Sequence, residues 1–367
     1  MRSTDSCHWN VSVIVRHHPL HVNGWVQPRP PMIVAAGGRR VTSADVARQA
    51  GVSRTTVSYV LNDTAHQKIP ESTRQRVLEA AARLAYAPSA AARALRNGRT
   101  DIVLCLLPDW PIGPTIGAFL EHLSTALASE GLMLVVHPRS GGARHIAEVW
   151  KAVTPAAVIA FEDFPRDEAA AMRAAGVEVV TALLGRSSRG REFGIPQQRS
   201  GCLQVEHLAA TGHRRLGYAF PADERVHSFA RPRLDGVRQA CADLGLDQPV
   251  VHTVPLDPEA AAGAVRAWRA AKPTVTGVCA FNDDTAFAVL AGLRWLGLSS
   301  PRDLAVVGVD DIPAAAFATP PLTTVTTDMA AVAAQLARTI TSSVTGKARP
   351  GRPDMRSIVH LVRRCSA

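Results

Sequence analysis

VTSADVARQAGVSRTTVSYVLN, residues 41–62, has the pattern of two short helices joined by a glycine turn. Thr42 and Asp45 stand at the spacing at which each side chain of a helix N-cap can bond a backbone N–H. Gly51 suits the turn that ends the first helix, and Ser53 is the expected cap of the second. The stretch therefore predicts a helix-turn-helix, a motif whose second helix can enter the major groove of DNA.

The second helix of this motif has two distinct faces. Val57, Val60 and Leu61 recur at helical spacing and should face a core. The opposite face offers short hydrogen-bonding groups, one cation and one phenol: Arg54, Thr55, Ser58, Tyr59 and Asn62. We expect Arg54 and Thr55 to reach base edges, and Thr56, Ser58 and Asn62 to hold phosphates. The alternative that this stretch leaves open is a helical hairpin whose outer face is merely polar.

Net charge supports a nucleic-acid partner. The 367 residues include 41 Lys and Arg against 31 Asp and Glu, which gives a net charge of +10. Between Val41 and Arg99 nine basic residues stand against four acidic ones. A basic segment of this kind attracts phosphate, although a solvated surface alone can show the same excess.

The length suggests two or three domains, and an apolar content of 47% is that of a folded globular protein. Six cysteines without a paired spacing fit free thiols in a reducing cytoplasm. No apolar run reaches the ~20 residues of a membrane helix, so no membrane partner is expected. Residues 1–40 are expected to be a disordered extension, and Met32 would serve as an alternative translation start.

Two further segments complete the predicted amino-terminal part. Pro70 to Tyr86 should form a third helix with Val77, Leu78, Ala81, Ala82 and Leu84 facing inward, which gives a compact headpiece over 41–86. Residues 87–99 predict a short linker helix that forms only when held in place. Leu95 on this helix is either a wedge that inserts between base steps in the minor groove or an ordinary linker leucine.

From Asp101 onward apolar strands alternate with segments of helical length. The first set is 102–107, 132–137, 156–161 and 177–182, and the second is RRLGYAF, PVVHTV, VTGVCAF and LAVVGV. Such strands predict parallel sheets covered on both faces, and the two sets predict two doubly wound subdomains. Ligands of such folds bind at the carboxyl ends of the strands, here in the cleft between the subdomains.

The common catalytic motifs of nucleotide-cofactor enzymes, P-loop enzymes, serine hydrolases and zinc proteases do not occur, and we expect no cofactor and no metal site. Polar groups at strand ends are Asp109, Asn282, Asp283, Asp310 and Asp311, and Arg233 lies in a helix beginning near Phe229. A cationic fork with carboxylates and an amide can hydrogen-bond a polyhydroxylated or heterocyclic small molecule. Asp283 and Asp311 could instead cap the helices that follow them.

Several stretches together resemble the LacI family of transcriptional regulators, over about residues 41–366. They are DVARQAGVSRTTVSYVLN, TRQRVLEAAARLAYAPSAAARALRNGRT, EHLAATGHRRLGY, RLDG at 233–236, FNDDTAFAVLAGLRWLGL and VVGVDDIPAAAFATPPLTTV. The resemblance implies a headpiece, a hinge helix and a core similar to periplasmic sugar-binding proteins. It also implies a homodimer on a palindromic operator in double-stranded DNA, controlled by a small effector that could be a sugar or a nucleobase-like compound.

The resemblance assigns roles to single residues. It makes Arg54, Thr55 and Tyr59 recognition-helix contacts, Leu95 the leucine inserted at the centre of the site, and Arg233, Asn282 and Asp310 effector contacts. To these effector contacts we add Asp109, because it follows a strand. The implied core spans 101–367, with one subdomain over about 101–198 and 327–348 and a second over about 199–324 and 352–367.

The sequence departs from the family at a few positions. Tyr59 stands where many members carry arginine, Ser89 replaces the common asparagine of the hinge start, and Pro70 replaces the usual cap serine of the third helix. PDWPIGPTI at 108–116 lacks the frequent asparagine-proline-aromatic pattern, and 194–197 lacks the usual aspartate, which argues against a standard sugar effector. The carboxyl terminus has no leucine heptad, so a dimer is expected and no tetramer.

The sequence thus predicts a cytoplasmic, ligand-responsive DNA-binding regulator, more often a repressor, and not an enzyme. The alternatives are a solute-binding protein or an enzyme on the same core, each with a vestigial headpiece. The operator, the effector and its direction of action are not contained in the sequence.

Overall fold

The structure, a computed structural model, describes residues 41–61, 69–86, 100–138, 146–161, 165–183, 193–194, 196–346 and 357–367. The chain divides into two compact units, residues 1–88 and 89–367. The predicted extension 1–40 and the predicted hinge helix 87–99 lie outside the described residues. No helix in the described ranges is long and apolar enough to cross a membrane.

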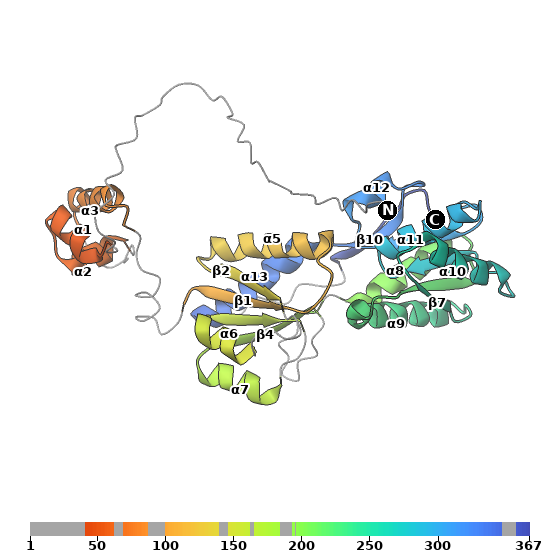
Figure 1. Cartoon of the computed structure of the whole chain (residues 1–367), viewed down its shortest axis with the longest axis horizontal. Coiled ribbons are helices and arrows are strands. Elements are labelled where there is room, and N and C mark those ends of the chain that lie inside the picture. The colour runs from red at the N-terminus through yellow and green to blue at the C-terminus, as the bar shows by residue number, and fades with distance from the viewer. Residues whose placement is uncertain are drawn as a thin grey trace, which may run out of the picture. The chain divides into compact units, whose positions relative to one another are not determined.

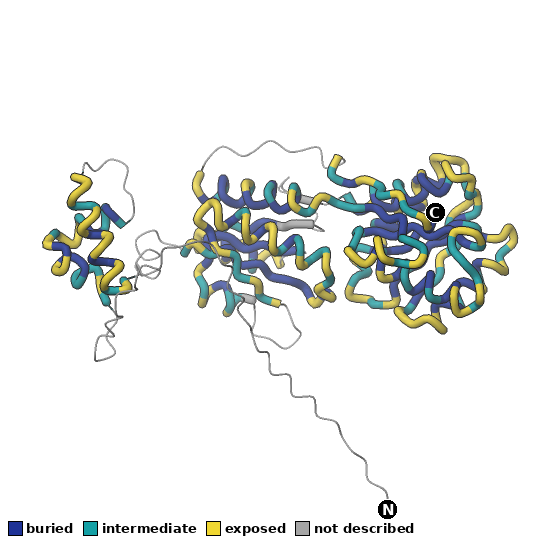
Figure 2. Tube along the Cα trace, turned by 90° about the horizontal axis from the view of Figure 1, so that it is seen from above, coloured by how far each residue is buried: buried dark blue, intermediate teal, exposed yellow. Residues whose placement is uncertain are grey.

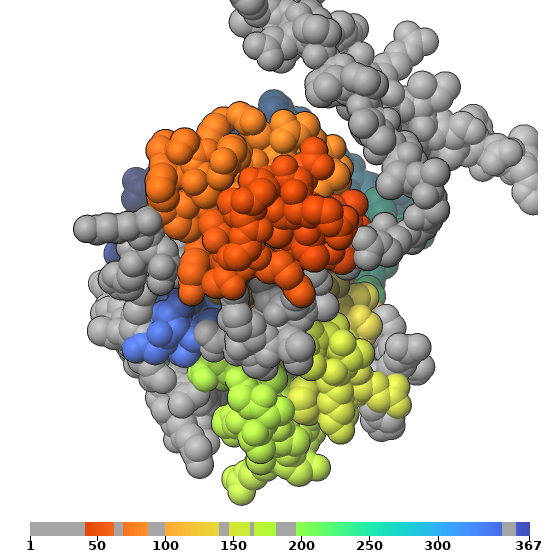
Figure 3. All heavy atoms as spheres, turned by 90° about the vertical axis from the view of Figure 1, so that its left-hand side faces the viewer, coloured from red at the N-terminus to blue at the C-terminus, as the bar shows by residue number. Residues whose placement is uncertain are grey.

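The described part of the first unit is a bundle of α1 (Ser43–Ala50), α2 (Arg54–Leu61) and α3 (Glu71–Arg83), which Figure 3 shows in red to orange as one packed body. Its core consists of small side chains from all three helices: Val46, Ala47, Ala50, Val57, Val60, Val77, Ala80 and Ala81. Small residues let the helices approach closely, so three short helices can share one core.

The predicted helix ends of the helix-turn-helix are confirmed. The Asp45 carboxylate accepts hydrogen bonds from the Thr42 backbone N–H at 2.9 Å and from the Thr42 hydroxyl at 2.7 Å. Gly51 ends α1 with φ of 65°, the left-handed region that favours glycine. The Ser53 hydroxyl accepts from the Thr56 N–H at 3.0 Å and caps α2.

The predicted inner face of α3 is partly wrong. Leu78 is 44% exposed and Ala82 is also exposed, whereas Ala80, which was not predicted to face inward, is fully buried. The core between the three helices accommodates the small side chain of Ala80. The larger side chain of Leu78 lies at the margin of this core and is partly in solvent. Val77 and Ala81 are buried as predicted.

The first sheet of the second unit is parallel and has the order β2-β1-β3-β4-β5 (Figure 1). Its strands are β1 (Ile102–Leu107), β2 (Met133–Pro138), β3 (Ala157–Ala160), β4 (Glu178–Leu183) and β5 (Phe193–Gly194). Its helices are α5 (Pro114–Ser129), α6 (Ile146–Val153), α7 (Arg166–Ala174) and α13 (Met329–Thr345). Alternate residues of β1 face opposite sides: Cys105 faces α5 and α13, and Leu104 faces α6 and α7.

The second sheet has the order β11-β10-β9-β8-β6-β7. Its strands are β6 (Leu216–Pro221), β7 (Val250–Val254), β8 (Gly277–Ala280), β9 (Ala305–Val309), β10 (Thr323–Thr327) and β11 (Val359–Val362). Its helical elements are α8 (Gln197–Ala210), η1 (Glu224–Val226), α9 (His227–Asp243), α10 (Pro258–Ala270), α11 (Asp283–Trp295) and α12 (Pro313–Phe317). Tyr218 and Cys279 face α8 and α9, whereas Ala219 and Val278 face α10 and α11. The central strands β1, β3, β8 and β9 are thus buried on both faces, whereas the edge strands β2 and β7 are partly exposed (Figure 2).

The eight predicted apolar strands are present, and the two sheets confirm the prediction of two strand sets. The predicted strands pair in parallel, and β11, which was not among them, runs antiparallel to β10 at one edge of the second sheet. Between these two strands the chain leaves the second sheet, forms α13 against α5 of the first sheet, and returns. Both α13 and β11 therefore contribute to structures that begin far upstream in the sequence.

Candidate functional site

In the headpiece, α2 presents the predicted recognition face. Arg54 and Thr55 are exposed, and Thr56, Ser58 and Tyr59 are half-buried. The Thr56 hydroxyl lies 2.9 Å from the Ser53 hydroxyl, so it also belongs to the cap of the helix. Asn62 and Leu95 lie outside the described residues.

Charges on the headpiece are distributed unevenly. On α1, Arg48 pairs with Asp45 at 3.4 Å, and on α3, Arg83 pairs with Glu79 at 3.8 Å. In contrast α2 contains no acidic residue, and Arg54 at its first turn is exposed. A cation at an exposed helix N-terminus between hydroxyl groups is suited to contact bases or phosphates in a groove.

The second unit contains a pocket with a cavity volume of about 130 Å³ that opens to solvent. Polar groups reach it from the first turn of α8, from α9, and from the segments that follow β8 and β9: Gln197, Arg233, Asn282, Asp284 and Asp310. These segments lie at the carboxyl ends of parallel strands, where ligands of doubly wound folds bind.

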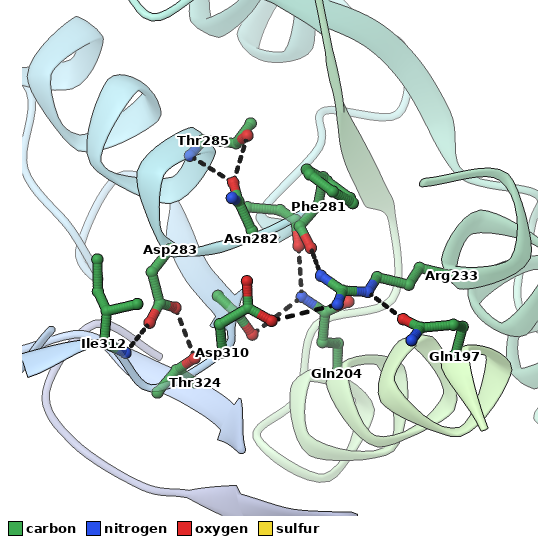
Figure 4. A network of polar contacts seen from close by, with 12 residues as sticks. Gln197, Gln204, Arg233, Phe281, Asn282, Asp283, Thr285, Asp310, Ile312 and Thr324 are labelled. Atoms are coloured by element: carbon green, nitrogen blue, oxygen red, sulfur yellow. Dashed lines mark hydrogen bonds and ion pairs between the residues drawn. The ribbon is translucent and has the colours of Figure 1, made fainter. Parts of the chain in front are cut away.

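Arg233 is the centre of the polar wall (Figure 4). It is 8% exposed, and its guanidinium donates through Nε to Gln197 Oε1 at 2.8 Å and through Nη1 to the Phe281 carbonyl at 2.8 Å. Through Nη2 it donates to Asp310 Oδ1 at 3.2 Å, which forms an ion pair. The guanidinium also lies over the Phe281 ring, 4.9 Å from its centroid. These contacts hold the side chain in one orientation towards the pocket.

Two glycines position Arg233. A Cβ at Gly201 of α8 would lie 2.1 Å from the Arg233 carbonyl oxygen, and one at Gly236 of α9 would lie 1.9 Å from the Gln198 carbonyl oxygen. Only glycine permits this approach of α8 and α9. The RLDG motif thus supplies both the arginine and the glycine that brings it beside Gln197.

The segment after β9 has an unusual backbone. Asp310 has φ of 109° and Asp311 has φ of 49°, a region that non-glycine residues rarely occupy. Asp311 pairs with Arg364 at 2.7 Å, and the Asp310 N–H donates to the Val325 carbonyl at 2.7 Å. Burial raises the pKa of the Asp310 carboxyl, while the neighbouring Arg233 acts in the opposite direction.

Asp283 is hydrogen-bonded to this segment and to β10 (Figure 4). It is fully buried, and its carboxyl accepts from the Ile312 N–H at 2.9 Å and from the Thr324 hydroxyl at 2.6 Å. Burial raises the pKa of Asp283 to about 7, and the two hydrogen bonds oppose this shift. Asp283 therefore connects α11 to β10 and to the loop that carries Asp310.

The structure decides between the open roles of the strand-end acids. Asn282, and not Asp283, caps α11, because Asn282 Oδ1 accepts from the Thr285 N–H at 2.9 Å and from its hydroxyl at 2.8 Å. Asp311 pairs with Arg364 and is not the cap of α12, whose N-cap is Ile312. The capping alternative for these two acids is therefore wrong.

Asp109 does not join the other predicted effector residues. Its side chain is 70% exposed and lies 4.0 Å from Arg225, and it is not part of the pocket lining. The next residue, Trp110, points inward and packs against Phe229 at 4.5 Å and Phe161 at 5.1 Å between ring centroids. The structure therefore brings together Arg233, Asn282 and Asp310 and leaves Asp109 outside the lining.

Sequence reasoning also missed Gln197 and Gln204. Gln197 opens α8 and orients Arg233, and buried Gln204 donates to the carbonyls of Ala280 at 2.8 Å and Val307 at 2.8 Å. Gln204 thus connects the end of β8 to the middle of β9. Gln204 belongs to no sequence pattern that could be identified without the fold, whereas Gln197 ends the stretch 194–197, where the missing aspartate was the one signal.

Comparison with known proteins gives two family matches. Residues 42–89 match the profile of bacterial regulatory proteins of the lacI family. Residues 205–367 match the profile of a periplasmic binding protein-like domain. The first match covers α1 to α3, and the second covers most of the elements that carry the polar wall of the pocket.

Relatives extend the likeness over most of the chain. The transcriptional regulator MalR of Streptomyces coelicolor is 30% identical over 325 residues, which are 84% of this chain and 91% of that protein. The structure of the regulator CelR in complex with cellobiose is similar at 27% identity, with a TM-score of 0.61 over 89% of this chain and 100% of that one. The Lac repressor dimer bound to operator and the anti-inducer ONPF shares the fold at 23% identity and a TM-score of 0.69, over 89% and 99% of the two chains. The chain therefore belongs to the LacI family of bacterial transcriptional regulators.

Proposed function

We propose that the chain is a sequence-specific DNA-binding repressor whose operator affinity depends on an effector bound beside Arg233. The observation that carries this proposal is the presence in one chain of a helix-turn-helix with an exposed Arg54 and a pocket with a fixed Arg233–Asp310 pair. The headpiece favours a regulator over a solute-binding protein, which would need only the pocket. The relatives are regulators and not enzymes, and we assign no catalytic residue.

DNA contacts follow from the position of each group on α2. Arg54 and Thr55, both exposed at the N-terminal turn, are proposed to reach base edges, and Tyr59 lies on the same helix one turn later. Thr56, Ser58 and Asn62 are proposed to hold phosphates. Leu95 is proposed to insert between base steps at the centre of the operator.

The effector is proposed to act by changing the position of one sheet of the second unit relative to the other. Its pocket takes residues from β1–α5 and α13 on one side and from α8, α9, α11 and the β9 end on the other. A ligand that contacts both sides of the pocket stabilises one arrangement of the two sheets relative to another. The free energy of coupling between effector binding and operator binding is typically about 1–3 kcal/mol. The groups that would hold it are Arg233, Asn282 and Asp310.

A homodimer is proposed from an apolar surface on α11 and α12. Phe287, Leu290, Ala314, Phe317 and Ala318 line an open groove there, and Phe317 is 86% exposed. A large aromatic side chain in water is unfavourable, and a two-fold axis would let this surface meet its own copy. A dimer presents two recognition helices, so its operator should be a palindrome.

Selection of bound sequences from random duplex DNA by the full-length chain tests this function. We expect enrichment of a palindrome with two half-sites and a flexible central step, and a steep fall of affinity with salt. A scrambled duplex of the same composition is the control for non-specific binding. If neither the protein alone nor the protein with a panel of small molecules enriches any sequence, the proposed function is wrong.

A further inference from the structure

The turn that follows β9, residues 310–312, contains two adjacent residues with positive φ. Asp310 has φ of 109° and Asp311 has φ of 49°. A residue with a Cβ rarely adopts such angles, because its Cβ comes too close to backbone oxygen. Two such residues in succession persist where contacts with the surrounding structure hold them in place. The groups that hold this turn therefore decide where the Asp310 carboxyl lies.

The backbone on either side of Asp311 is fixed by hydrogen bonds. The Asp310 N–H donates to the Val325 carbonyl of β10 at 2.7 Å. The Ile312 N–H donates to the carboxyl of buried Asp283 at 2.9 Å. Neither bond involves Asp311 itself, so the left-handed conformation of Asp311 depends on what its own side chain contacts.

The side chain of Asp311 is held by Arg364, which follows β11. Arg364 donates through Nη2 to Asp311 Oδ1 at 2.7 Å and through Nη1 to the Leu322 carbonyl at 2.9 Å. Its backbone N–H donates to the Thr323 hydroxyl at 3.0 Å. Both charged side chains are mostly buried, so solvent and salt screen this ion pair weakly. A guanidinium that is fixed at a second point in this way holds the carboxylate in one place.

The chain beside Arg364 is itself fixed to the sheet. Ser366 is fully buried, and its hydroxyl donates to the Val306 carbonyl of β9 at 2.6 Å. The same hydroxyl accepts from the Thr323 N–H of β10 at 2.8 Å. Arg364 is thus anchored to β9 and β10, the strand that precedes the turn and its neighbour in the sheet.

We propose that Arg364 is a positioning residue of the pocket, which holds Asp311 in the left-handed conformation and thereby places the Asp310 carboxyl against Arg233. This inference rests on the proposed function, because Asp310 and Arg233 are two of the groups proposed to hold the effector. Asp310 Oδ1 accepts from Arg233 Nη2 at 3.2 Å, so this contact depends on the direction in which the turn presents the Asp310 side chain. Arg364 acts through Asp311 and is not part of the described lining of the pocket.

The rate at which phenylglyoxal modifies Arg233 tests this role without a ligand. The reagent attacks guanidinium groups, and mass spectrometry of peptides from the full-length protein gives the initial rate for each arginine. In the natural protein Arg233 is buried and bonded to Asp310, so its modification should be slow. Arg364→Gln should release Asp311 and, through it, Asp310. The modification rate of Arg233 should then rise about tenfold, as expected for the loss of one charged hydrogen bond.

A second arginine and a neighbouring variant serve as controls. Arg215 precedes β6, and its side chain is partly exposed, so its rate reports on loosening of the second sheet as a whole. This rate should be the same in every variant. Arg363→Gln, at the exposed residue next to Arg364, should leave the rate of Arg233 unchanged.

Asp311→Ala provides an independent variant at the other end of the ion pair. Alanine at this position keeps the unfavourable φ and lacks the carboxylate, so Arg233 should be modified as fast as in Arg364→Gln. If Arg364→Gln does not fold, Asp311→Ala decides by itself. Rates of Arg233 within about twofold of the natural protein, or a rise that Arg215 shares equally, would overturn the proposal. No DNA takes part in this measurement, so its failure is distinguishable from failure of the proposed function in operator selection.

Discussion

Asp283→Asn tests whether the fold keeps the buried carboxyl of α11 protonated. Asp283 is fully buried and accepts from the Ile312 N–H and the Thr324 hydroxyl. Asparagine can retain both contacts, because its carbonyl oxygen accepts from Ile312 and its amide donates to the Thr324 oxygen. The variant therefore removes the titration of this position with little change in packing.

The expected magnitude follows from the pKa. The pKa of Asp283 rises from 3.8 to about 7 in the fold, chiefly through burial, and one pKa unit corresponds to about 1.4 kcal/mol, so the total is on the order of 4 kcal/mol. The pKa in the folded state lies above that in the unfolded state, so protonation of Asp283 contributes to the free energy of unfolding. This contribution is fully present below about pH 4 and is lost as the pH rises to about 7. Above about pH 7 the free energy of unfolding no longer changes with the titration of Asp283. Relative to Asp283→Asn, the natural protein should lose about 1.4 kcal/mol in its free energy of unfolding per pH unit between about pH 5 and pH 7.

Urea unfolding followed by tryptophan fluorescence at about pH 5, 6, 7 and 8 measures this difference. Asp247→Asn, which removes a carboxylate that is 70% exposed and lies 3.7 Å from Arg215, controls for the loss of one negative charge. A difference between the natural protein and Asp283→Asn that stays constant within about 0.5 kcal/mol over this range would refute the reasoning. It would mean that the two hydrogen bonds hold Asp283 as a carboxylate despite its burial.

Four further variants test the proposed sites. Arg54→Ala should relax base preference at one position of each half-site at a loss of about 1–3 kcal/mol in specific binding, and an unchanged selected consensus would argue against a base contact. Leu95→Ala should weaken specific binding in gel-shift titrations and leave non-specific affinity nearly unchanged; equal losses would remove the wedge. Arg233→Gln should abolish the effector response while operator binding persists, because its contacts lie within the pocket wall; a normal response would place the effector elsewhere. Phe317→Asp should yield a monomer in sedimentation, whereas Leu256→Asp, at a residue that is 70% exposed, should remain dimeric; a dimeric Phe317→Asp would mean that the copies meet through another surface.

The helix-turn-helix could be predicted because its signals are local. The cap at Thr42, the glycine at 51 and the spacing of Val57 and Val60 all act within two turns of helix. The buried face of α3 was harder to predict, because hydrophobicity favours burial of Leu78 over Ala80. Only the size of the core that the three helices share decides that Ala80 is the buried residue.

Eight apolar strands were predictable from the sequence, whereas the polar strand β10 was not. β10 has the sequence TTVTT, and its buried threonines are satisfied by distant groups: Thr323 by Ser366 and Arg364, and Thr324 by Asp283. The sequence around β10 contains no pattern that predicts these hydrogen-bond partners.

The effector site shows the same limit. Arg233, Asn282 and Asp310 lie in motifs and at strand ends, so chemistry and position indicated them. Asp109 also follows a strand, yet it is exposed while its neighbour Trp110 faces inward. Which of two adjacent loop residues enters a pocket depends on packing against partners such as Phe229, more than 100 positions away in the sequence.

The passage of α13 onto the first sheet has a consequence for synthesis of the protein on the ribosome. The apolar side of α5, with Phe119, Leu123 and Leu127, shares one core with Leu336 and Ile340 of α13. All strands of the first sheet leave the ribosome before α13 does, because α13 begins only at Met329. Until then α5 alone covers this side of the nascent sheet, and the apolar surface that α13 will bury is exposed, as is typical of the surfaces that chaperones bind. The ribosome thus translates strands β6 to β10 of the second sheet after α5 and before α13, the two helices that share the core of the first sheet.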